Sequence, residues 1–330
     1  MDEVRVCTTP TEALNAFHRY QRRRGHQAST QRAYDQFLEP FAVWLGNSGF
    51  DRVDARDIEF GWLEHWSEAF QARWSREPST RHVRNHLTAL KVFFNFLDRF
   101  GYLRSNPMRR IDRPAIVKRT PDWLSVDEDA AMLGAVSTPL ERILVPLLRW
   151  TGMRSSEAEA LRWQNVRFAD QEIWVTTSKT PGGRRVIPIF DPLMPVLEEW
   201  HRRRDSLAGT GEQCFVLATS SGKPLSHTQV WVSVKRVAHR AGVRRQVAPD
   251  RGGMNVSAVS PHTLRRTFAS DLFNRGARLE VISRLLGHSE TRTTEASYAQ
   301  LLDARISWEA RSAYARQTQT QYQTPVTVSP

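Results

Sequence analysis

Apolar residues recur at helical spacing along the first third of the chain. A short segment around Leu14 and Phe17 opens the pattern, and Gly101 stops it. Between them lie three longer series with apolar residues mostly three or four positions apart: Tyr34, Phe37, Leu38, Phe41 and Leu45; Ile58, Trp62, Trp66 and Phe70; Val83, Leu87, Leu90, Phe94 and Leu97. Such stripes are typical of helices that bury one face. We therefore predict a bundle of about four helices here.

A segment without helical periodicity follows from Asn106. Pro107, Pro114 and Pro121 follow among basic residues without an apolar stripe, which is typical of an extended linker. The polar end of the chain has no core-forming pattern and is predicted to be disordered. We predict four parts: a helical domain over residues 1–111, a linker over 112–121, a second domain over 122–316 and a tail over 317–330.

The second domain mixes helices with a few strands. Ser125 and Glu128 form a capping-box signal, which predicts the start of a helix. Alternating residues on both sides of the turn Pro181-Gly182-Gly183 predict two antiparallel strands. We expect helices over residues 154–163 and 226–242 and strands over 172–177 and 184–189. The predicted fold class is mainly α, a helical bundle followed by a mostly helical domain with one small antiparallel sheet.

The composition points to a polyanionic partner. The 330 residues include 47 Lys and Arg against 35 Asp and Glu, a formal net charge of +12. Only five of the basic residues are lysines, and arginine grips phosphate oxygens in a bidentate fork. Nucleic acid is therefore the first partner to consider. The length suits about two domains, each with its own core.

Several classes of protein are excluded by what the sequence lacks. No run of eighteen apolar residues predicts a membrane span, and the N-terminus lacks a signal peptide, so we expect a soluble, cytoplasmic protein. Cys7 and Cys214 are too few for a disulfide framework or a cysteine zinc site. No Gly-x-x-x-x-Gly-Lys-Ser/Thr loop occurs, which argues against ATP-driven activities such as helicase action.

Arg154 and Lys179 are the first candidates for chemistry. Arg154 follows Gly152 at a predicted helix start, where anions are favoured, and Glu157 stands one turn on, where it can pair with Arg154. Such a pair alone is common on helix surfaces. Lys179 stands at the predicted hairpin tip of a chain that otherwise prefers arginine, and a lysine can release its proton where an arginine cannot. Lys223 lies in a similar turn and competes with it.

The remaining candidates lie in the last third of the chain. His262 and Arg265 share a helical face, and His288 precedes Tyr298 by ten residues. Each histidine alone is more often structural, and a two-histidine metal site lacks a third ligand at helical spacing. Together the candidates suit metal-free phosphoryl transfer, because two arginines can neutralise a phosphodiester and a tyrosine ester conserves the bond energy for rejoining. That chemistry also fits the missing ATP loop.

These motifs resemble the active-site signature of the tyrosine recombinase (phage integrase) family, in order and approximate spacing. The residues that carry the resemblance are Arg154, Lys179, His262-x-x-Arg265, Leu285-Leu286-Gly287-His288 and Tyr298. Residues from about 10 to 105 look like the family's SAM-like core-binding domain, and those from about 122 to 311 like its catalytic domain. The resemblance implies a metal- and ATP-independent enzyme without cofactors, which cuts duplex DNA through a 3′-phosphotyrosyl intermediate.

Residue roles also follow from the resemblance. Tyr298 would attack the scissile phosphate, Arg154 and Arg265 would bind it, His262 and Lys179 would serve acid–base roles, and His288 would hydrogen-bond the phosphate. Lys179, not Lys223, matches the family's hairpin lysine. Arg266 replaces the family's usual histidine, and the interval from His288 to Tyr298 is one residue longer than usual. Tyr322 and then Tyr314 are the alternative nucleophiles.

The resemblance leaves the biological role open. We expect a recombinase that integrates or excises a mobile element, bound as a dimer at each DNA site and as a tetramer on paired sites. The alternatives are a chromosome or plasmid dimer resolvase of the Xer type and a non-catalytic DNA-binding factor on the same scaffold. A type IB topoisomerase-like enzyme would share the chemistry. No separate arm-binding domain fits before residue 10, which suits the simpler two-domain recombinases.

Overall fold

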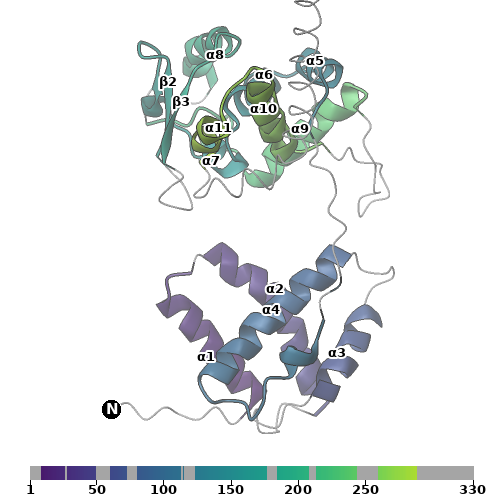
Figure 1. The fold of residues 1–330 in the computed structure, drawn as a ribbon. Coiled ribbons are helices and arrows are strands. Elements are labelled where there is room, and N and C mark those ends of the chain that lie inside the picture. The colour runs from purple at the N-terminus through teal and green to yellow at the C-terminus, as the bar shows by residue number, and fades with distance from the viewer. Residues whose placement is uncertain are drawn as a thin grey trace, which may run out of the picture. The chain divides into compact units, whose positions relative to one another are not determined.

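The computed structural model divides the chain into two compact units, residues 1–118 and 119–330 (Figure 1). The structure describes residues 9–26, 28–49, 60–72, 80–112, 114, 123–176, 184–207, 213–243 and 259–287. The roles that the sequence assigned to the domains 1–111 and 122–316 and to the linker 112–121 stay predictions. A bilayer-spanning helix is absent from the described part of the chain, since none of its helices combines the necessary length with enough apolar character.

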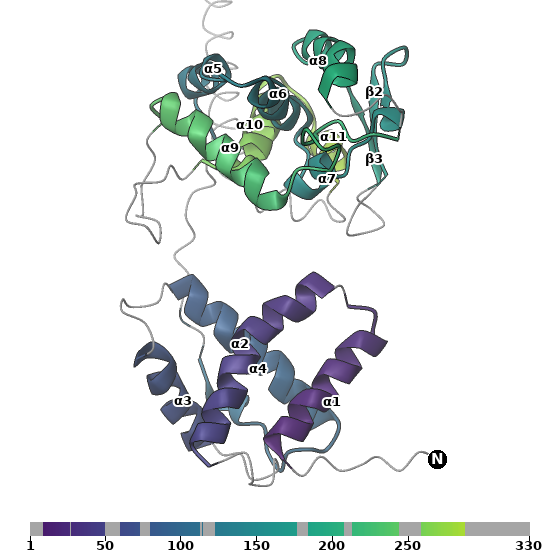
Figure 2. The ribbon, with the colours of Figure 1, turned by 180° about the vertical axis from the view of Figure 1, so that it is seen from behind.

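The first unit is a helical bundle, as predicted. Its helices are α1 (Pro10–Arg23), α2 (Ala28–Asn47), α3 (Phe60–Ala72) and α4 (Thr80–Arg99), followed by a 3₁₀ helix over Pro107–Arg110. Helix α4 packs against α1 and α2, and the 3₁₀ helix packs against α3 and α4 (Figures 1 and 2). Asn106 caps the 3₁₀ helix, and Arg109 pairs with Asp98 at 2.9 Å.

Aromatic side chains fill the core of this bundle, which explains the predicted stripes. Phe17, Phe41, Trp66 and Phe94 are buried, and the Phe41 ring meets Trp66 edge to face and Phe94 at a tilt. A cavity of about 520 Å³ is lined by side chains of α2 and α3. The residues that line it are Glu39, Pro40, Val43, Trp44, Asn47, Trp66 and Ala69, so it includes none of the predicted site residues.

The second unit is mostly helical with one antiparallel sheet, in agreement with the predicted fold class. Its elements are α5 (Val126–Gly134), α6 (Pro139–Thr151), α7 (Ser155–Glu159), a 3₁₀ helix (Trp163–Asn165), β1 (Val166–Arg167), β2 (Glu172–Val175), β3 (Arg185–Pro188), α8 (Met194–Leu207), α9 (His227–Arg240), α10 (Pro261–Asn274) and α11 (Leu279–Leu286). The capping box of Ser125 and Glu128 starts α5 as predicted. Strand order is β1-β2-β3, with Trp174 opposite Val186.

Two local predictions were wrong. The helix expected over 154–163 ends at Glu159, because Arg162 takes an extended conformation and pairs with Phe215 in an isolated bridge. The sheet has a third strand, β1, whose two residues are too few to show an alternating pattern.

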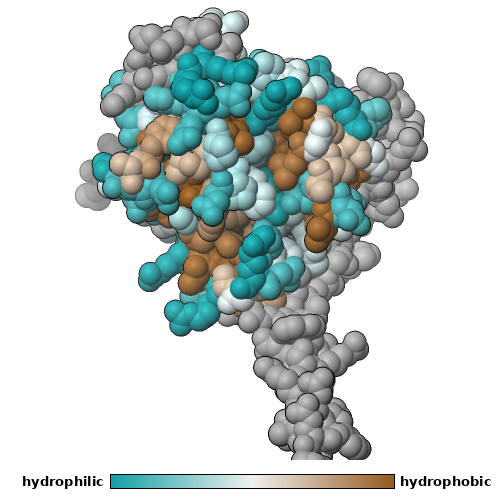
Figure 3. All heavy atoms as spheres, turned by 90° about the horizontal axis from the view of Figure 1, so that it is seen from above, coloured by the Kyte–Doolittle hydropathy of each residue, from teal (hydrophilic) through white to brown (hydrophobic). Residues whose placement is uncertain are grey.

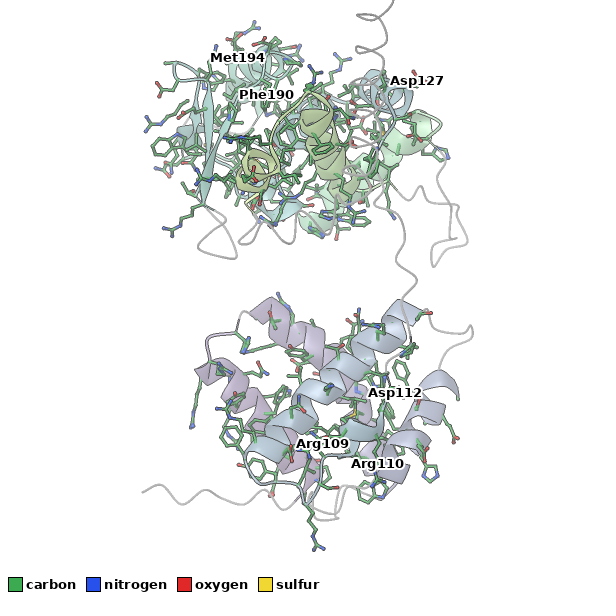
Figure 4. The ribbon with its side chains drawn as sticks, in the orientation of Figure 1. Arg109, Arg110, Asp112, Asp127, Phe190 and Met194 are labelled. Carbon is green, nitrogen blue, oxygen red and sulfur yellow. The ribbon has the colours of Figure 1, made fainter. Side chains whose placement is uncertain are left out.

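Helix α6 lies at the centre of the second unit. It packs against α8, α9 and α10, and its residues Leu144 and Leu147 are fully buried (Figures 1 and 2). A smaller cluster joins α10 to α11 through Phe268 and Leu286, and Phe190 packs on Phe268 from the loop before Met194 (Figure 4). On the face seen in Figure 3, hydrophobic residues form separate patches among hydrophilic ones. The central helix thus places the start of α7 beside α10 and α11.

Candidate active site

Arg154 stands at the junction of α6 and α7. Gly152 ends α6 in the left-handed conformation, with φ at 60°, and Arg154 is the N-cap of α7. Glu157 accepts a hydrogen bond from the Arg154 backbone N–H at 2.9 Å and another from its Nη1 at 2.8 Å. The predicted pair of Arg154 and Glu157 is therefore present. The Arg154 side chain stays 38% exposed, so it can meet an anion from solvent.

Arg265 approaches the same junction from α10. Arg265 is only 2% exposed, and its Nη1 donates to the carbonyl of Gly152 at 2.6 Å. A Cβ at residue 152 would lie 2.4 Å from a Phe268 ring carbon, so only glycine leaves room for this junction. The two arginines thus converge on the turn between α6 and α7.

The C-terminal end of α11 holds three arginines in a row. The carbonyl of Leu285 accepts from Arg185 Nε at 2.5 Å, that of Leu286 from Arg265 Nη2 at 2.5 Å, and that of Gly287 from Arg154 Nη2 at 3.1 Å. The last carbonyls of a helix lack helical partners and carry partial negative charge, which suits guanidinium donors. This helix end therefore fixes the spacing of the arginines.

Glu157 is the buried anion of the cluster. Its side chain is 2% exposed and bonds to Arg185 Nη2 at 2.8 Å and to Arg185 Nη1 at 3.1 Å, besides its bonds to Arg154. Burial alone would raise the pKa of the Glu157 carboxyl, but the hydrogen bonds and charge of Arg185, and then the hydrogen bonds from Arg154, lower it below its usual value. Glu157 is thus an ionised link between two arginines.

His262 lies one turn before Arg265 on α10. Desolvation by the surrounding protein, and then the positive charges of Arg266, Arg265 and Arg154, lower its pKa to about 4. The residue nevertheless keeps more than a third of its surface open to solvent, so it can still exchange a proton with a ligand. His262 is therefore neutral at pH 7 and able to accept a proton.

The structure brings together three of the six predicted site residues, Arg154, His262 and Arg265. Lys179, His288 and Tyr298, with the alternative nucleophiles Tyr314 and Tyr322, lie outside the described residues. The competing Lys223 is exposed in a turn closed by a hydrogen bond from the Thr219 backbone N–H to its carbonyl. Within the described ranges, no three His, Cys, Asp or Glu side chains group in a way that could hold a metal ion.

Sequence reasoning missed Arg185. Its side chain is only 6% exposed, and its position on β3 alternates with the exposed Val186 and matches the buried Ile187. An arginine on the inward face of a strand requires a buried acceptor. The alternation of buried and exposed positions along β3 was the available signal. The partners of Arg185 lie too far away along the chain to be inferred from spacing.

The arrangement suits binding of a phosphodiester. Arg154 and Arg265 bind the same helix end, and the neutral His262 lies near enough for their charges to lower its pKa. The partly exposed Arg154 opens the cluster to solvent. Fixed positive groups of this kind stabilise the charge that develops on phosphate oxygens during displacement at phosphorus.

Comparisons with known proteins agree with this chemistry. The model of the Phage integrase family matches residues 123–305. A tyrosine recombinase of Thermosipho africanus is 28% identical over 277 residues, covering 82% of this chain and 88% of that protein. The tyrosine recombinase XerD of Lacticaseibacillus casei is 29% identical over 282 residues, with the same coverage of both chains.

Solved structures share the fold. The Tn1549 transposon integrase in complex with transposon right end DNA has a TM-score of 0.70 at 17% identity, covering 89% of this chain and 99% of that one. A lambda integrase dimer bound to a COC′ core site has a TM-score of 0.67 at 17% identity, covering 88% and 95%.

Proposed function

Because this chain belongs to the phage integrase family, the tyrosine recombinases, we propose that it recombines the ends of a mobile element through Tyr298. The protein is a site-specific DNA recombinase, an enzyme that cuts and rejoins DNA strands. The observation that carries the proposed mechanism is the convergence of Arg154 and Arg265 at the end of α11, with His262 one turn before Arg265 on α10.

In this mechanism the arginines hold the scissile phosphate. Arg154 and Arg265 neutralise its non-bridging oxygens as phosphorus becomes pentacovalent, and His288 adds a hydrogen bond. The rigid carbonyls that orient both guanidinium groups support this assignment, because preorganised donors need not rearrange during the reaction. No metal ion is required for this charge neutralisation.

Proton transfers complete the displacement. Tyr298 Oη bonds to phosphorus and loses its proton to neutral His262, while the bond from phosphorus to the 5′-oxygen breaks and Lys179 protonates that oxygen. The products are a 3′-phosphotyrosyl link and a free 5′-hydroxyl. The reverse sequence rejoins a strand, with the 5′-hydroxyl of the partner DNA as the nucleophile, and needs no ATP.

The proposal includes the assembly on DNA. The first unit would act as the core-binding domain, a dimer would occupy each duplex site, and a tetramer would join two sites. The lambda integrase of the comparison is a dimer on its core site, which supports the first of these steps. DNA as substrate also supports a cytoplasmic location.

A dimer-resolving role is the second candidate. The relatives from Lacticaseibacillus casei and Corynebacterium glutamicum are both named XerD, which favours this role. Paired inverted repeats around the gene, and recombination of a circular junction made from them, would support the mobile-element role. Recombination restricted to a single chromosomal site would support the resolvase role instead.

The nucleophile can be tested with a nicked suicide substrate. Wild type should accumulate a covalent protein–DNA complex that survives detergent, because the nicked fragment diffuses away after cleavage. Tyr298→Phe should lose the complex entirely, since the phenolic oxygen is the attacking atom. Tyr314→Phe and Tyr322→Phe are the matched controls and should retain it. An adduct formed by Tyr298→Phe would contradict the assignment.

A further inference from the structure

Arg185 ties three parts of the second unit together at the active site. It belongs to β3, its Nη atoms bind the buried Glu157 of α7, and its Nε binds the Leu285 carbonyl at the end of α11. With 6% of its side chain exposed, Arg185 offers almost no surface to DNA. Its contacts therefore act on other residues of the site.

We propose that Arg185 is a positioning residue for strand cleavage, which holds Glu157 and the end of α11 so that Arg154 and the segment leading to His288 keep their places. This inference rests on the proposed recombinase mechanism. The Arg154 side chain donates to Glu157 and to the Gly287 carbonyl, and Arg185 contacts the first of these directly and the helix end that carries the second. Arg185 thus holds both groups that accept hydrogen bonds from the Arg154 side chain.

Close packing shows how tightly Arg185 determines this helix end. Gly287 has φ at 65°, and a Cβ there would lie 2.8 Å from Arg185 Nη1. The guanidinium therefore lies directly against the backbone of the residue that precedes His288. A lysine could keep the charge but not the fork, because a single ammonium cannot hold Glu157 bidentately and reach the Leu285 carbonyl with fixed geometry.

Electrostatics give the contact a second effect. Arg185 is the largest of the causes that lower the pKa of the Glu157 carboxyl, and burial works in the opposite direction. Without Arg185, the pKa of Glu157 should rise, since burial would be opposed by Arg154 alone. A protonated Glu157 would lose its charge-assisted bond to Arg154. Without Arg185, the cleavage rate should therefore fall at acidic pH.

The test compares Arg185→Gln and Arg185→Lys with wild type in single-turnover cleavage of the suicide substrate at saturating DNA. Under conditions where the variants are fully folded, Arg185→Gln should slow cleavage about 100-fold, the effect of a misplacement near 1 Å. Arg185→Lys should recover part of the rate. Arg167→Gln, on the exposed side of the same sheet, removes an equal charge and should cleave normally.

The pH profile separates positioning from mere loss of structure. Arg185→Gln should lose further activity on the acidic side, and Arg185→Gln with Glu157→Gln should be slow but without this extra acidic loss. Wild-type cleavage rates in Arg185→Gln, or a loss that only follows the unfolded fraction, would overturn the proposal.

A measurement without DNA keeps this inference distinct from the proposed function. In wild type, inorganic phosphate should bind near Arg154 and raise the pKa of His262, seen in the NMR signals of its ring. The affinity of Arg185→Gln for phosphate should be at least tenfold lower than that of wild type. If wild type binds phosphate but never forms a covalent complex, the recombinase mechanism is wrong. The positioning role is then tested by comparing phosphate binding in wild type and Arg185→Gln. Equal phosphate binding in both proteins would overturn the positioning role.

Discussion

At the scale of single residues, Gly152 determines whether the site can assemble. Its left-handed conformation ends α6, its carbonyl receives Arg265, and its missing side chain admits the Phe268 ring. The Phe268 ring also packs against Phe190, with ring centroids 6.0 Å apart. The position therefore combines a backbone requirement with a packing requirement.

Gly152→Ala should destabilise the second unit by about 2–4 kcal/mol, from left-handed strain and overpacking against Phe268. Gly242 is the matched control, because its φ of 68° imposes the same strain but no atom lies within 4 Å of its hypothetical Cβ. Gly242→Ala should cost about 1 kcal/mol. Urea unfolding of the two variants measures the difference, and equal losses would show that the Phe268 contact does not matter.

Residue spacing also marks the limit of what the sequence could predict about the site. Glu157 was predictable as the partner of Arg154, because both lie within one turn. Arg185 was not, since its partners Glu157 and Leu285 are 28 and 100 positions away. The roles of Lys179, His288 and Tyr298 stay predictions from the family resemblance.

At the scale of elements, α3 and α4 meet through a buried histidine. Trp66 of α3 donates its indole N–H to His86 Nε2 of α4 at 2.7 Å, and the ring of Phe70 stacks on His86 with centroids 3.9 Å apart. Burial, and then the charge of His82, lower the pKa of His86 to about 4. Packing of these helices therefore requires the neutral imidazole.

The first unit should lose stability in acid because of His86. The unfolded histidine binds a proton near pH 6.5 and the folded one only near pH 4, so stability falls as the pH drops through this window and levels off below it. The loss from His86 should reach roughly 2–3 kcal/mol. Unfolding of His86→Gln, which keeps an acceptor for Trp66, should lack this component. An unchanged pH dependence in that variant would contradict the assignment.

The sequence predicted the elements that depend on residues nearby in the chain. It did not predict the helix end that depends on a residue far along the chain. Apolar stripes and capping boxes identified the bundle helices and α5, because helix formation there depends on neighbours along the chain. The early end of α7 depends on the bridge from Arg162 to Phe215, more than fifty positions away. Periodicity within α7 carries no information about that bridge.

At the scale of the whole molecule, each unit has its own buried core. Aromatic residues fill the first, and branched aliphatic residues around α6 dominate the second. Both units also contain more basic than acidic residues. Stability and DNA affinity should therefore be divided between the units.

Separate fragments of residues 1–118 and 119–330 should each fold and unfold cooperatively, with midpoints close to those of the intact chain. Each should bind duplex DNA more weakly than the whole protein and with a smaller salt dependence, because fewer phosphates are neutralised. Calorimetry and DNA titrations at several salt concentrations measure both quantities. A fragment that lacks a cooperative transition would show that the two cores depend on each other.

The row of carbonyls at the end of α11 also has a consequence for biosynthesis. Arg154 is synthesised 133 residues before Gly287, whose carbonyl accepts its hydrogen bond. At roughly 5–20 residues per second, the two are made on the order of ten seconds apart. A nascent chain thus cannot arrange its arginines until Gly287 has been made. A DNA-cutting enzyme is in this way kept inactive while this part of its chain is still being made.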